Sequence, residues 1–484
     1  MDPVRDKTLG MSADSSASRV SNGVDASAHF KGKKITLMRI GLLGRGVGDA
    51  AYLAKCGADV LVVDDAPQAV MQPSVDALKE FPNIKFKFGP YDLADFRNCD
   101  MVLRGAGTPL DSPEIAEAKN RNIPVRMSAD LFAEISGVTC IGVTGTRGKS
   151  TVVHMLHSIL KEAGKKVLLG GNVRGVSTLA LLSEATPEHV AVLELDSWQL
   201  QGWGEARMSP HIAVFTTLYP DHLNYYSRAS ERIAKMNLGN SERAMDESSA
   251  YHDDMGAYLA DKANIFLNQT ADDALIIGKQ CAPTIIDRYG EQIESKTLVV
   301  DELKLPDTWA LRIPGMHNRY DAALALAAAR ALNISDETSH KALVAFAGVP
   351  GRLELIREVN GVKVYNDTTS TTPEATLAAL AALDPAHVVL IAGGSDKNLD
   401  MNALLVKLGE VKRVVLLAGT GTNRVLEFIP GASVFDSLEV AVREAFAAAG
   451  KGDTLLFSPA FTSFGMFKNE FDRGDQFAAI VQTL

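Results

Sequence analysis

The chain has 484 residues, a length that predicts two to four compact units rather than one domain. It carries 49 Lys and Arg against 59 Asp and Glu, and this net charge of −10 argues against a nucleic-acid binder with a basic surface. The four cysteines are too scattered for a disulfide framework or a zinc cluster: Cys56, Cys99, Cys140 and Cys281. No apolar run approaches the roughly 18 residues that a membrane span needs, so the sequence predicts a cytoplasmic protein without membrane insertion.

The beginning of the chain differs in composition from the rest. Residues 1–34 are rich in Ser, Asp, Gly and Ala and have no apolar period, which predicts a disordered leader. Beyond them, short apolar runs at 40–43, 60–63 and 101–103 alternate with helix-like stretches. Such runs, broken by glycine turns, are typical of parallel strands covered by helices on both faces. We therefore assign a first α/β domain to residues 35–137.

Two further α/β units follow in the same pattern. The second, residues 138–349, has strand candidates at 140–143, 167–169, 190–195 and 212–216. A polar, turn-rich stretch at 227–252 interrupts it as a surface insertion, and an Ala-rich helix is expected at 322–332. The third, residues 350–484, has strand candidates at 362–365, 388–392, 414–418 and 454–457. The sequence thus predicts an α/β protein of three successive domains.

The most specific local signal is a glycine-rich turn between the predicted strand 140–143 and a helix that begins near Lys149. Gly145 and Gly148 let backbone N–H groups curl around phosphate oxygens, and the helix N-terminus adds positive potential. Lys149 can reach the β- and γ-phosphates of a nucleotide, and the Ser150 hydroxyl can ligate Mg²⁺. Only two residues separate the glycines, where the common pattern has four, so this is a variant of the phosphate loop. The alternative, a plain strand-turn-helix connection, fits Gly-Lys-Ser after a buried strand poorly.

This variant loop resembles that of the Mur ligase superfamily, ATP-dependent enzymes that join an amino acid to a carboxylate. Six further segments match the family in the right order: 170–172, 194–200, 220–223, 315–318, 351–354 and 366–367. The resemblance covers nearly everything after the leader. It implies a Rossmann-like N-terminal domain, a central domain with a P-loop ATPase-type parallel sheet, and a Rossmann-like C-terminal domain.

Two features are similar to the glutamate-adding branch of that family. The first domain opens with a glycine turn at 41–48, followed by a strand that ends in Asp64 and Asp65, where an acidic group can hold a ribose hydroxyl. The C-terminal segment 458–469 contains Ser-Pro-Ala, then a serine, then Phe-Lys-Asn. The likeness implies UDP-N-acetylmuramoyl-L-alanine and glutamate as substrates. The residues implied to contact the UDP sugar are Arg45, Gly46, Asp64, Asp65, Gly107 and Asn172.

The resemblance also implies an acyl-phosphate mechanism that uses ATP and two Mg²⁺ ions. The implied catalytic residues are Lys149, Glu194, His222, Lys262 and Arg352. The implied ATP contacts are Gly145, Thr146, Gly148, Lys149, Ser150, Thr151, Asn318, Arg352 and Asp367. The implied metal ligands are Ser150, Glu194, His222 and Lys262, of which the first two would hold one ion through oxygen.

A carbamylated lysine serves the second ion in this family, and two lysines are candidates. Lys235 lies closer to His222 in the sequence, whereas Lys262 better matches the family context of a preceding Tyr and a following Ile and aromatic residue. We favour Lys262, which places the insertion 227–252 between His222 and its partner. A solvated helix lysine is the ordinary alternative for either residue.

The implied glutamate site consists of Thr371, Lys397 and Ser463, and here the chain departs from the family. Thr369 replaces a lysine of the pocket, and Glu470 stands where a phenylalanine is usual. One cation fewer at a dicarboxylate site leaves the handedness of the amino acid, and its identity, open at this stage.

Two alternative functions remain to be weighed. A folylpolyglutamate synthase shares the second and third domains and the chemistry, but it normally lacks a UDP-binding first domain. A non-catalytic nucleotide-binding regulator is disfavoured because the residues predicted to bind phosphate and metal are intact. The chain is expected to act as a monomer.

Overall fold

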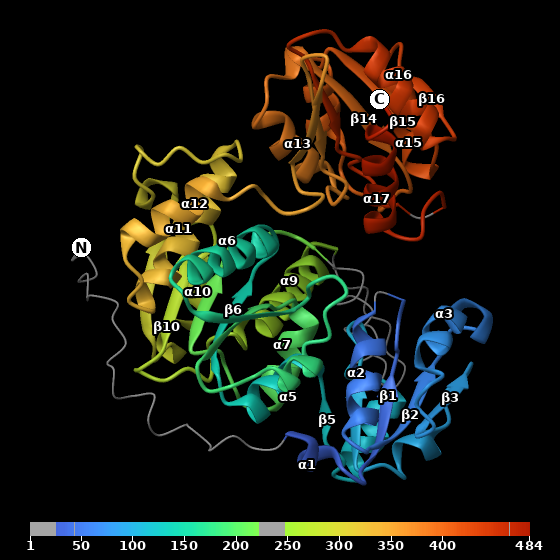
Figure 1. Cartoon of the computed structure of the whole chain (residues 1–484), viewed down its shortest axis with the longest axis vertical. Coiled ribbons are helices and arrows are strands. Elements are labelled where there is room, and N and C mark those ends of the chain that lie inside the picture. The colour runs from blue at the N-terminus through green and yellow to red at the C-terminus, as the bar shows by residue number, and fades with distance from the viewer. Residues whose placement is uncertain (1–25, 43, 222–246, 464) are drawn as a thin grey trace. The chain divides into compact units, whose positions relative to one another are not determined.

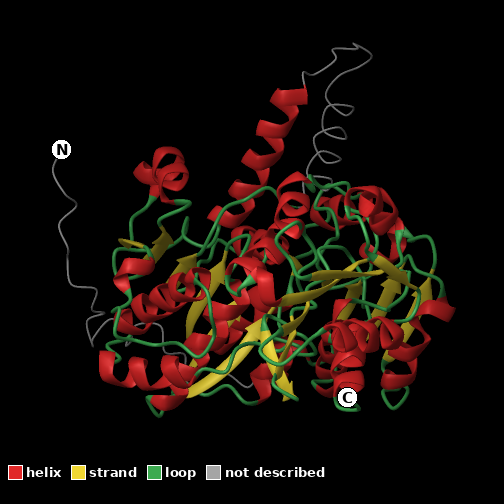
Figure 2. Ribbon diagram, turned by 90° about the horizontal axis from the view of Figure 1, so that it is seen from above, coloured by secondary structure: helices red, strands yellow, loops and turns green. Residues whose placement is uncertain are grey.

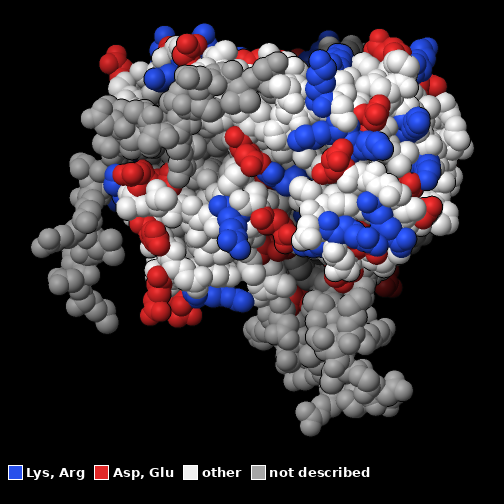
Figure 3. All heavy atoms as spheres, turned by 90° about the horizontal axis from the view of Figure 1, so that it is seen from below, with Lys and Arg blue, Asp and Glu red and all other residues white. Residues whose placement is uncertain are grey.

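A computed structural model of the chain describes residues 26–42, 44–221, 247–463 and 465–484. These residues form two compact units (Figure 1). One contains the chain up to Leu305 together with Asp321–Ala342, and the other contains Pro306–Tyr320 and Leu343–Leu484. Among the helices of the described residues, none combines the length and the hydropathy that a transmembrane span requires. On the face shown in Figure 3, basic and acidic side chains are interspersed.

The N-terminal domain is built on a five-stranded parallel sheet in the order β3-β2-β1-β4-β5. Its strands are β1 (Lys34–Met38), β2 (Asp59–Asp64), β3 (Ile84–Phe88), β4 (Met101–Arg104) and β5 (Val125–Arg126). Its helices are α1 (Ala26–Phe30), α2 (Arg45–Lys55), α3 (Gln68–Leu78), η2 (Leu93–Phe96), α4 (Pro113–Asn120) and α5 (Ser128–Ser136). This strand order is that of a Rossmann-like domain, and it changes direction between β1 and β4, where such folds bind ligands. The predicted α/β class is confirmed here.

Two predictions for this domain differ from the structure. The predicted leader reaches residue 34, whereas α1 lies within it and the Phe30 side chain is completely buried in the core. The first strand is Lys34–Met38, and residues 40–42 of the run at 40–43 that we predicted as a strand lie after it, outside any strand. The reason is that residues 35–38 are buried between β2 and β4, which supply the hydrogen-bonding partners that local hydropathy does not reveal.

The central domain carries a six-stranded parallel sheet in the order β11-β10-β9-β6-β8-β7. The strands are β6 (Thr139–Thr144), β7 (Lys166–Gly171), β8 (His189–Glu194), β9 (Ile212–Phe215), β10 (Ala274–Gly278) and β11 (Lys296–Val300). The helical elements are α6 (Lys149–Glu162), η3 (Leu179–Ser183), α7 (Ser197–Glu205), α9 (Glu247–Ala263), α10 (Ala282–Tyr289), η4 (Gly290–Gln292), η5 (Glu302–Lys304), α11 (Met316–Ala331) and α12 (Asp336–Ala345). The four predicted strands correspond to β6 through β9. Most of the predicted insertion at 227–252 lies outside the described residues, and its last residues belong to α9.

The C-terminal domain has a six-stranded sheet in the order β12-β13-β17-β14-β15-β16, parallel except for the edge strand β12. The strands are β12 (Glu354–Val359), β13 (Val362–Asn366), β14 (Val388–Gly393), β15 (Arg413–Leu417), β16 (Ser433–Phe435) and β17 (Thr454–Phe457). The helical elements are α13 (Pro373–Ala381), η6 (Pro385–His387), α14 (Asn402–Leu408), α15 (Thr420–Val425), η7 (Leu426–Phe428), α16 (Leu438–Ala448) and α17 (Glu470–Val481).

Alternate residues of β14 pack into two different apolar clusters of the C-terminal domain. Val388 and Leu390 belong to one cluster, and Val389 and Ile391 belong to the other. Because successive side chains of a strand point to opposite faces, both faces of this sheet are buried. Helices flank the strands accordingly (Figure 2). This two-sided burial explains why the strand sequences are continuously apolar.

A buried carboxylate joins the N-terminal and central domains within the first unit. Asp49 on α2 accepts hydrogen bonds through Oδ1 from the hydroxyl of Ser128 at 2.8 Å and from the hydroxyl of Ser177 at 2.6 Å. The Ser128 hydroxyl in turn accepts from the backbone N–H of Leu179 at 2.9 Å. Helix α2 is therefore tied by polar contacts to the segment that follows β7.

Replacing Asp49 with Asn should remove a pH dependence of stability. Burial raises the pKa of Asp49 from 3.8 to about 6. Between these pH values the folded chain holds a proton that the unfolded chain has released, so the free energy of unfolding falls as the pH rises. From about pH 4 to pH 7, wild type should lose about 2–3 kcal/mol more stability than Asp49→Asn does.

Urea unfolding at several pH values in this range measures the difference. Asp59→Asn, at an exposed position on β2, is the matched control and should keep the wild-type slope. Identical pH slopes for wild type and Asp49→Asn would contradict the prediction.

Candidate functional site

The predicted UDP-sugar residues of the N-terminal domain lie at the carboxyl ends of β1, β2 and β4. Asp64 ends β2 and accepts a hydrogen bond from the backbone N–H of Ala66 at 3.0 Å. Asp65 follows it and is partly exposed. Gly107 lies in the turn after β4 with a φ of +78°. These ends meet at the point where the strand order changes direction, as a ligand crevice requires.

Arg45 and Gly46 are the first two residues of α2, the helix that follows β1. A Cβ on Gly46 would lie 2.2 Å from the carbonyl oxygen of Ile40, so this close approach of helix and strand requires glycine. The Arg45 guanidinium donates to Oδ1 of Asn172, which follows β7 of the central domain. The structure therefore brings two of the predicted substrate residues into direct contact.

Two arginines at the carboxyl ends of β1 and β4 were not singled out from the sequence. Arg39, directly after β1, donates to Oδ2 of Asp65 at 2.9 Å and to the carbonyl oxygen of Gly107 at 3.5 Å. Arg104, at the end of β4, is 3% exposed and donates to the carbonyl oxygen of Thr108 at 2.9 Å and to Oε1 of Gln201 at 3.0 Å. Arg39 is the first residue after β1 and Arg104 is the last residue of β4, but the local sequence carries no signal that separates either from a solvated arginine.

The phosphate loop connects β6 to α6 as predicted, and α6 begins at Lys149. Gly145 has a φ of +136°, and a Cβ there would lie 2.0 Å from Oγ1 of Thr216. Gly148 has a φ of +86°, and a Cβ there would lie 2.4 Å from Oδ1 of Asp321. Both positions therefore need glycine for conformation and for space.

The Ser150 hydroxyl at the loop lies beside Glu194 at the end of β8, the two residues predicted to hold one Mg²⁺. The Ser150 hydroxyl donates to Oε2 of Glu194 at 2.6 Å, and both residues are buried. Lys149 donates through Nζ to the carbonyl oxygens of Gly145 at 3.0 Å and Thr146 at 3.2 Å. Thr151 follows in the first turn of α6. Two adjacent hard oxygen donors beside a lysine fit a magnesium ion and the phosphates that it accompanies.

Helix α9 brings Tyr258 and Lys262 onto the phosphate loop from one face, because the two are one turn apart. Lys262 is 1% exposed, and its Nζ donates to the carbonyl oxygen of Gly145 at 3.1 Å and to Oγ1 of Thr144 at 3.3 Å. The Tyr258 hydroxyl lies 3.3 Å from Oγ1 of Thr146. Burial, together with the positive charge of Lys149, lowers the pKa of Lys262 to about 7.

Three further candidate residues from the sequence have no contact, in the part of the chain that the structure describes, that tests their predicted roles. His222 and the alternative lysine, Lys235, lie outside the described residues. Asn318, in the first turn of α11, is buried and donates through Nδ2 to the carbonyl oxygen of Pro314 at 2.5 Å. Its role at adenine stays a prediction.

In the C-terminal domain, Asp367 organises the turn after β13. Its carboxylate accepts hydrogen bonds from the hydroxyl of Ser370 at 2.5 Å, from the hydroxyl of Ser458 at 2.7 Å and from the backbone N–H of Leu353 at 2.9 Å. Burial raises the pKa of Asp367 to about 6. Arg352, next to Leu353, is exposed. The predicted contacts of both residues with ATP stay predictions.

The predicted amino-acid site is partly assembled in this domain. Nζ of Lys397 donates to Oγ1 of Thr371 at 3.3 Å, and both residues line a small pocket with Phe461. Ser463 is 4% exposed and is not among the residues that line this pocket. Thr369 stands where the family has a pocket lysine, and here its hydroxyl donates to the carbonyl oxygen of Gly351 at 2.9 Å. The threonine therefore has a structural role in this turn.

The fold and the loop define a class: an α/β protein with a phosphate-binding loop at the carboxyl edge of a parallel sheet. Comparison with known proteins narrows this class. Residues 143–243 match the family model of the Mur ligase middle domain, and residues 351–461 match that of the Mur ligase glutamate ligase domain.

The relatives match along nearly the whole chain. The UDP-N-acetylmuramoylalanine–D-glutamate ligase of Roseiflexus sp. (strain RS-1) is 35% identical over 467 residues, which cover 93% of this chain and 99% of that protein. The protein of that name from Borreliella afzelii (strain PKo) is 32% identical over 490 residues, 94% of this chain and 99% of its own. The solved UDP-N-acetylmuramate–alanine ligase of Thermotoga maritima shares the fold with a TM-score of 0.56 and 18% identity, covering 93% of this chain and 99% of that one. The chain belongs to the Mur ligase family of ATP-dependent acid–amino-acid ligases.

Replacing Gly148 with Ala should weaken nucleotide binding at the loop. The new Cβ would approach Oδ1 of Asp321 to 2.4 Å, so the turn must move and its N–H groups lose their alignment. We expect the affinity for magnesium and ATP to fall by at least about tenfold, together with a loss of about 1–3 kcal/mol of stability.

Gly164→Ala provides the matched control. Gly164 also has a positive φ, +69°, but a Cβ added there would have no heavy atom within 4 Å, and the residue lies beyond the other end of α6. Calorimetric titration should show wild-type affinity for this control. Wild-type affinity in Gly148→Ala would instead disprove that this turn binds the nucleotide.

Proposed function

We propose that the protein joins D-glutamate to UDP-N-acetylmuramoyl-L-alanine, with cleavage of ATP to ADP and phosphate, in the synthesis of peptidoglycan precursors. The observation that carries this proposal is the identity of 30–35% with ligases of that name along nearly the whole chain, the first domain included. A folylpolyglutamate synthase normally lacks a UDP-binding first domain, whereas the D-glutamate ligases named above match this chain along its first domain as well. With these substrates, we propose that the enzyme acts in the bacterial cytoplasm.

The proposed chemistry has two steps. A carboxylate oxygen of the alanyl group attacks the γ-phosphorus of ATP, and ADP leaves with the electrons of the broken P–O bond. The amine of glutamate then attacks the acyl carbon, loses a proton, and inorganic phosphate leaves. Phosphoryl transfer asks mainly for positioning and charge neutralisation. Lys149 and the backbone N–H groups at the start of α6 supply these at the phosphates.

Ser150 and Glu194 are the residues that would hold Mg²⁺. Their oxygens lie 2.6 Å apart in a buried position, and hydroxyl and carboxylate oxygens are the ligands that this hard cation prefers. The ion would neutralise phosphate charge. We assign a second ion to His222 and Lys262, and we propose that Lys262 is carbamylated. In its neutral form the lysine amine adds CO₂ and releases a proton. A side chain that is a cation when protonated thereby becomes an anionic oxygen ligand.

The contacts of Lys262 support this assignment. Its Nζ is buried against the carbonyl oxygen of Gly145, and its pKa of about 7 leaves much of the amine neutral at physiological pH. In the C-terminal domain, Thr371, Lys397 and Ser463 are proposed to bind glutamate, with the ammonium group of Lys397 pairing with one carboxylate. We propose a monomeric enzyme.

Phosphate release tests the proposed reaction. Protein, ATP, Mg²⁺ and UDP-N-acetylmuramoyl-L-alanine should release phosphate when D-glutamate is added, and much less with L-glutamate. Lys149→Ala should lower this rate by about 10²–10³-fold while the circular dichroism spectrum stays unchanged. Phosphate release that requires a folate instead of the UDP sugar would show that the protein is a folate ligase. No phosphate release with either the UDP sugar or a folate would favour a non-catalytic regulator.

A second experiment tests the carbamate. With isotopically labelled bicarbonate, wild type should show a carbamate signal by nuclear magnetic resonance, and Lys262→Met should lack it. Lys235→Met is the matched control and should retain the signal. Loss of the signal in the Lys235 variant alone would move the assignment to that lysine.

A further inference from the structure

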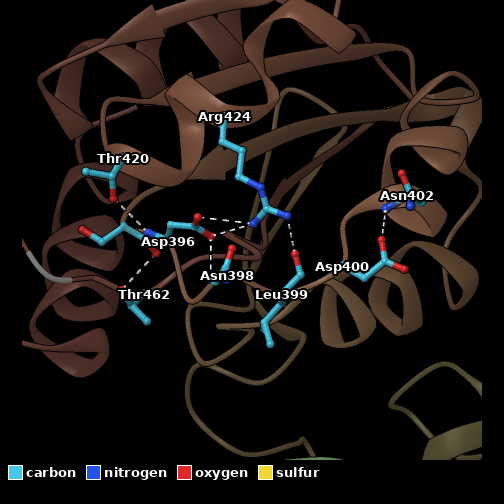
Figure 4. Close-up of polar contacts among 9 residues, drawn as sticks. Asp396, Asn398, Leu399, Asp400, Asn402, Thr420, Arg424 and Thr462 are labelled. Atoms are coloured by element: carbon cyan, nitrogen blue, oxygen red, sulfur yellow. Dashed lines mark hydrogen bonds and ion pairs between the residues drawn. The ribbon is translucent and has the colours of Figure 1, made fainter. Parts of the chain in front are cut away.

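Arg424 forms hydrogen bonds on both sides of Lys397, in the loop at 396–399. It lies on α15 and donates through Nη1 to both carboxylate oxygens of Asp396, at 3.0 and 3.3 Å. Its Nη2 donates to the carbonyl oxygen of Leu399 at 2.8 Å. One side chain therefore bonds to the residue before Lys397 and to the second residue after it (Figure 4). These contacts span the loop at 396–399.

Further contacts fix the same turn. The backbone N–H of Asp396 donates to Oγ1 of Thr420, one turn before Arg424 on α15, at 3.0 Å. Oδ1 of Asp396 also accepts from the backbone N–H of Asn398 at 2.9 Å, and Asn398 has a φ of +58°. A non-glycine residue holds this left-handed conformation when its surroundings determine it. The Asp396 carboxylate is thus the centre of the turn, and Arg424 is its charged partner.

The charge of Asp396 matters because this residue lines the pocket together with Lys397 and Thr371. An unpaired carboxylate there would repel an anionic substrate and would attract the Lys397 ammonium group. The guanidinium of Arg424 contacts both oxygens and so cancels this charge. The side chains of Arg424 and Asp396 are 38% and 25% exposed, so the pair contributes little to the stability of the fold. A role in substrate binding is the better account of the pair.

We propose that Arg424 is a positioning residue for the amino-acid substrate. It holds the loop that presents Lys397, and it neutralises Asp396 so that the pocket accepts a dicarboxylic amino acid. This inference rests on the proposed function, because it concerns the glutamate site of that reaction. Arg424 itself does not need to touch the substrate.

Steady-state kinetics of the full chain test the proposal. In Arg424→Ala, the KM for glutamate should rise about tenfold, whereas kcat and the KM values for ATP and the UDP sugar should stay within about twofold. Arg424→Lys should lie between this variant and wild type, since it keeps the charge but loses the planar fork. Arg443→Ala, which removes an exposed arginine of α16 in the same domain, is the control and should behave as wild type.

A double variant separates charge from simple loss of structure. Asp396→Asn combined with Arg424→Ala removes the carboxylate that the single variant leaves unpaired, so its KM for glutamate should be lower than that of Arg424→Ala. Equal KM values in these two variants would overturn the neutralising role.

Two results would overturn the inference as a whole. One is an unchanged KM for glutamate in active Arg424→Ala. The other is an equal rise of all three KM values with a lower melting temperature. A wild-type protein without glutamate-dependent phosphate release would instead overturn the proposed function, on which the inference rests.

Discussion

Two lysine side chains converge on one backbone carbonyl at the centre of the phosphate loop. Lys149 comes from α6 and Lys262 from α9, and both donate to the carbonyl oxygen of Gly145, at 3.0 and 3.1 Å. Burial, and after it the positive charge of Lys149, lowers the pKa of Lys262 to about 7. The arrangement therefore leaves Lys149 as the cation that faces phosphate, and it favours the neutral amine of Lys262, which is the form that the proposed carbamylation requires.

Three of the buried carboxylates, Glu194, Asp49 and Asp367, share one type of partner. Glu194 accepts from Ser150, Asp49 from two serines, and Asp367 from two more. A serine hydroxyl satisfies a carboxylate at short distance without adding a second full charge, and it can rotate toward another acceptor. Each carboxylate is bonded to at least one element distant in sequence. The polar contacts of the interior thus fix the turns from which the assigned residues project.

Local patterns in the sequence predicted the backbone of the site, because strand and helix periodicity and glycine spacing act over short distances. The loop at 145–148 follows from such patterns, whereas the pairing of Ser150 with Glu194 was expected only from the family resemblance. What local patterns could not give depends on contacts between distant segments. The first strand was assigned to 40–43 rather than Lys34–Met38 because its partners β2 and β4 come later in the chain.

Side-chain partners were the least predictable part. Gln199 matched a family motif, yet its amide oxygen accepts from the backbone N–H of Asp196 and caps α7. Arg39 and Arg104 were missed because nothing in their immediate neighbourhood distinguishes them from solvated arginines. The contact of Arg424 with Asp396 spans 28 residues, and only the placement of α15 beside the loop reveals it.

The place of β17 in the C-terminal sheet has a consequence for biosynthesis. This strand, Thr454–Phe457, lies between β13 and β14, so the sheet lacks its middle until the last part of the chain has been translated. The central sheet is complete once β11 has emerged from the ribosome. A nascent chain can therefore complete the central sheet, which carries the phosphate loop, first. Strands β13 and β14 cannot be joined into one sheet until β17 has been synthesised. A premature stop codon just before β17 would leave two unpaired inner edges, which are ready targets for proteases and for aggregation.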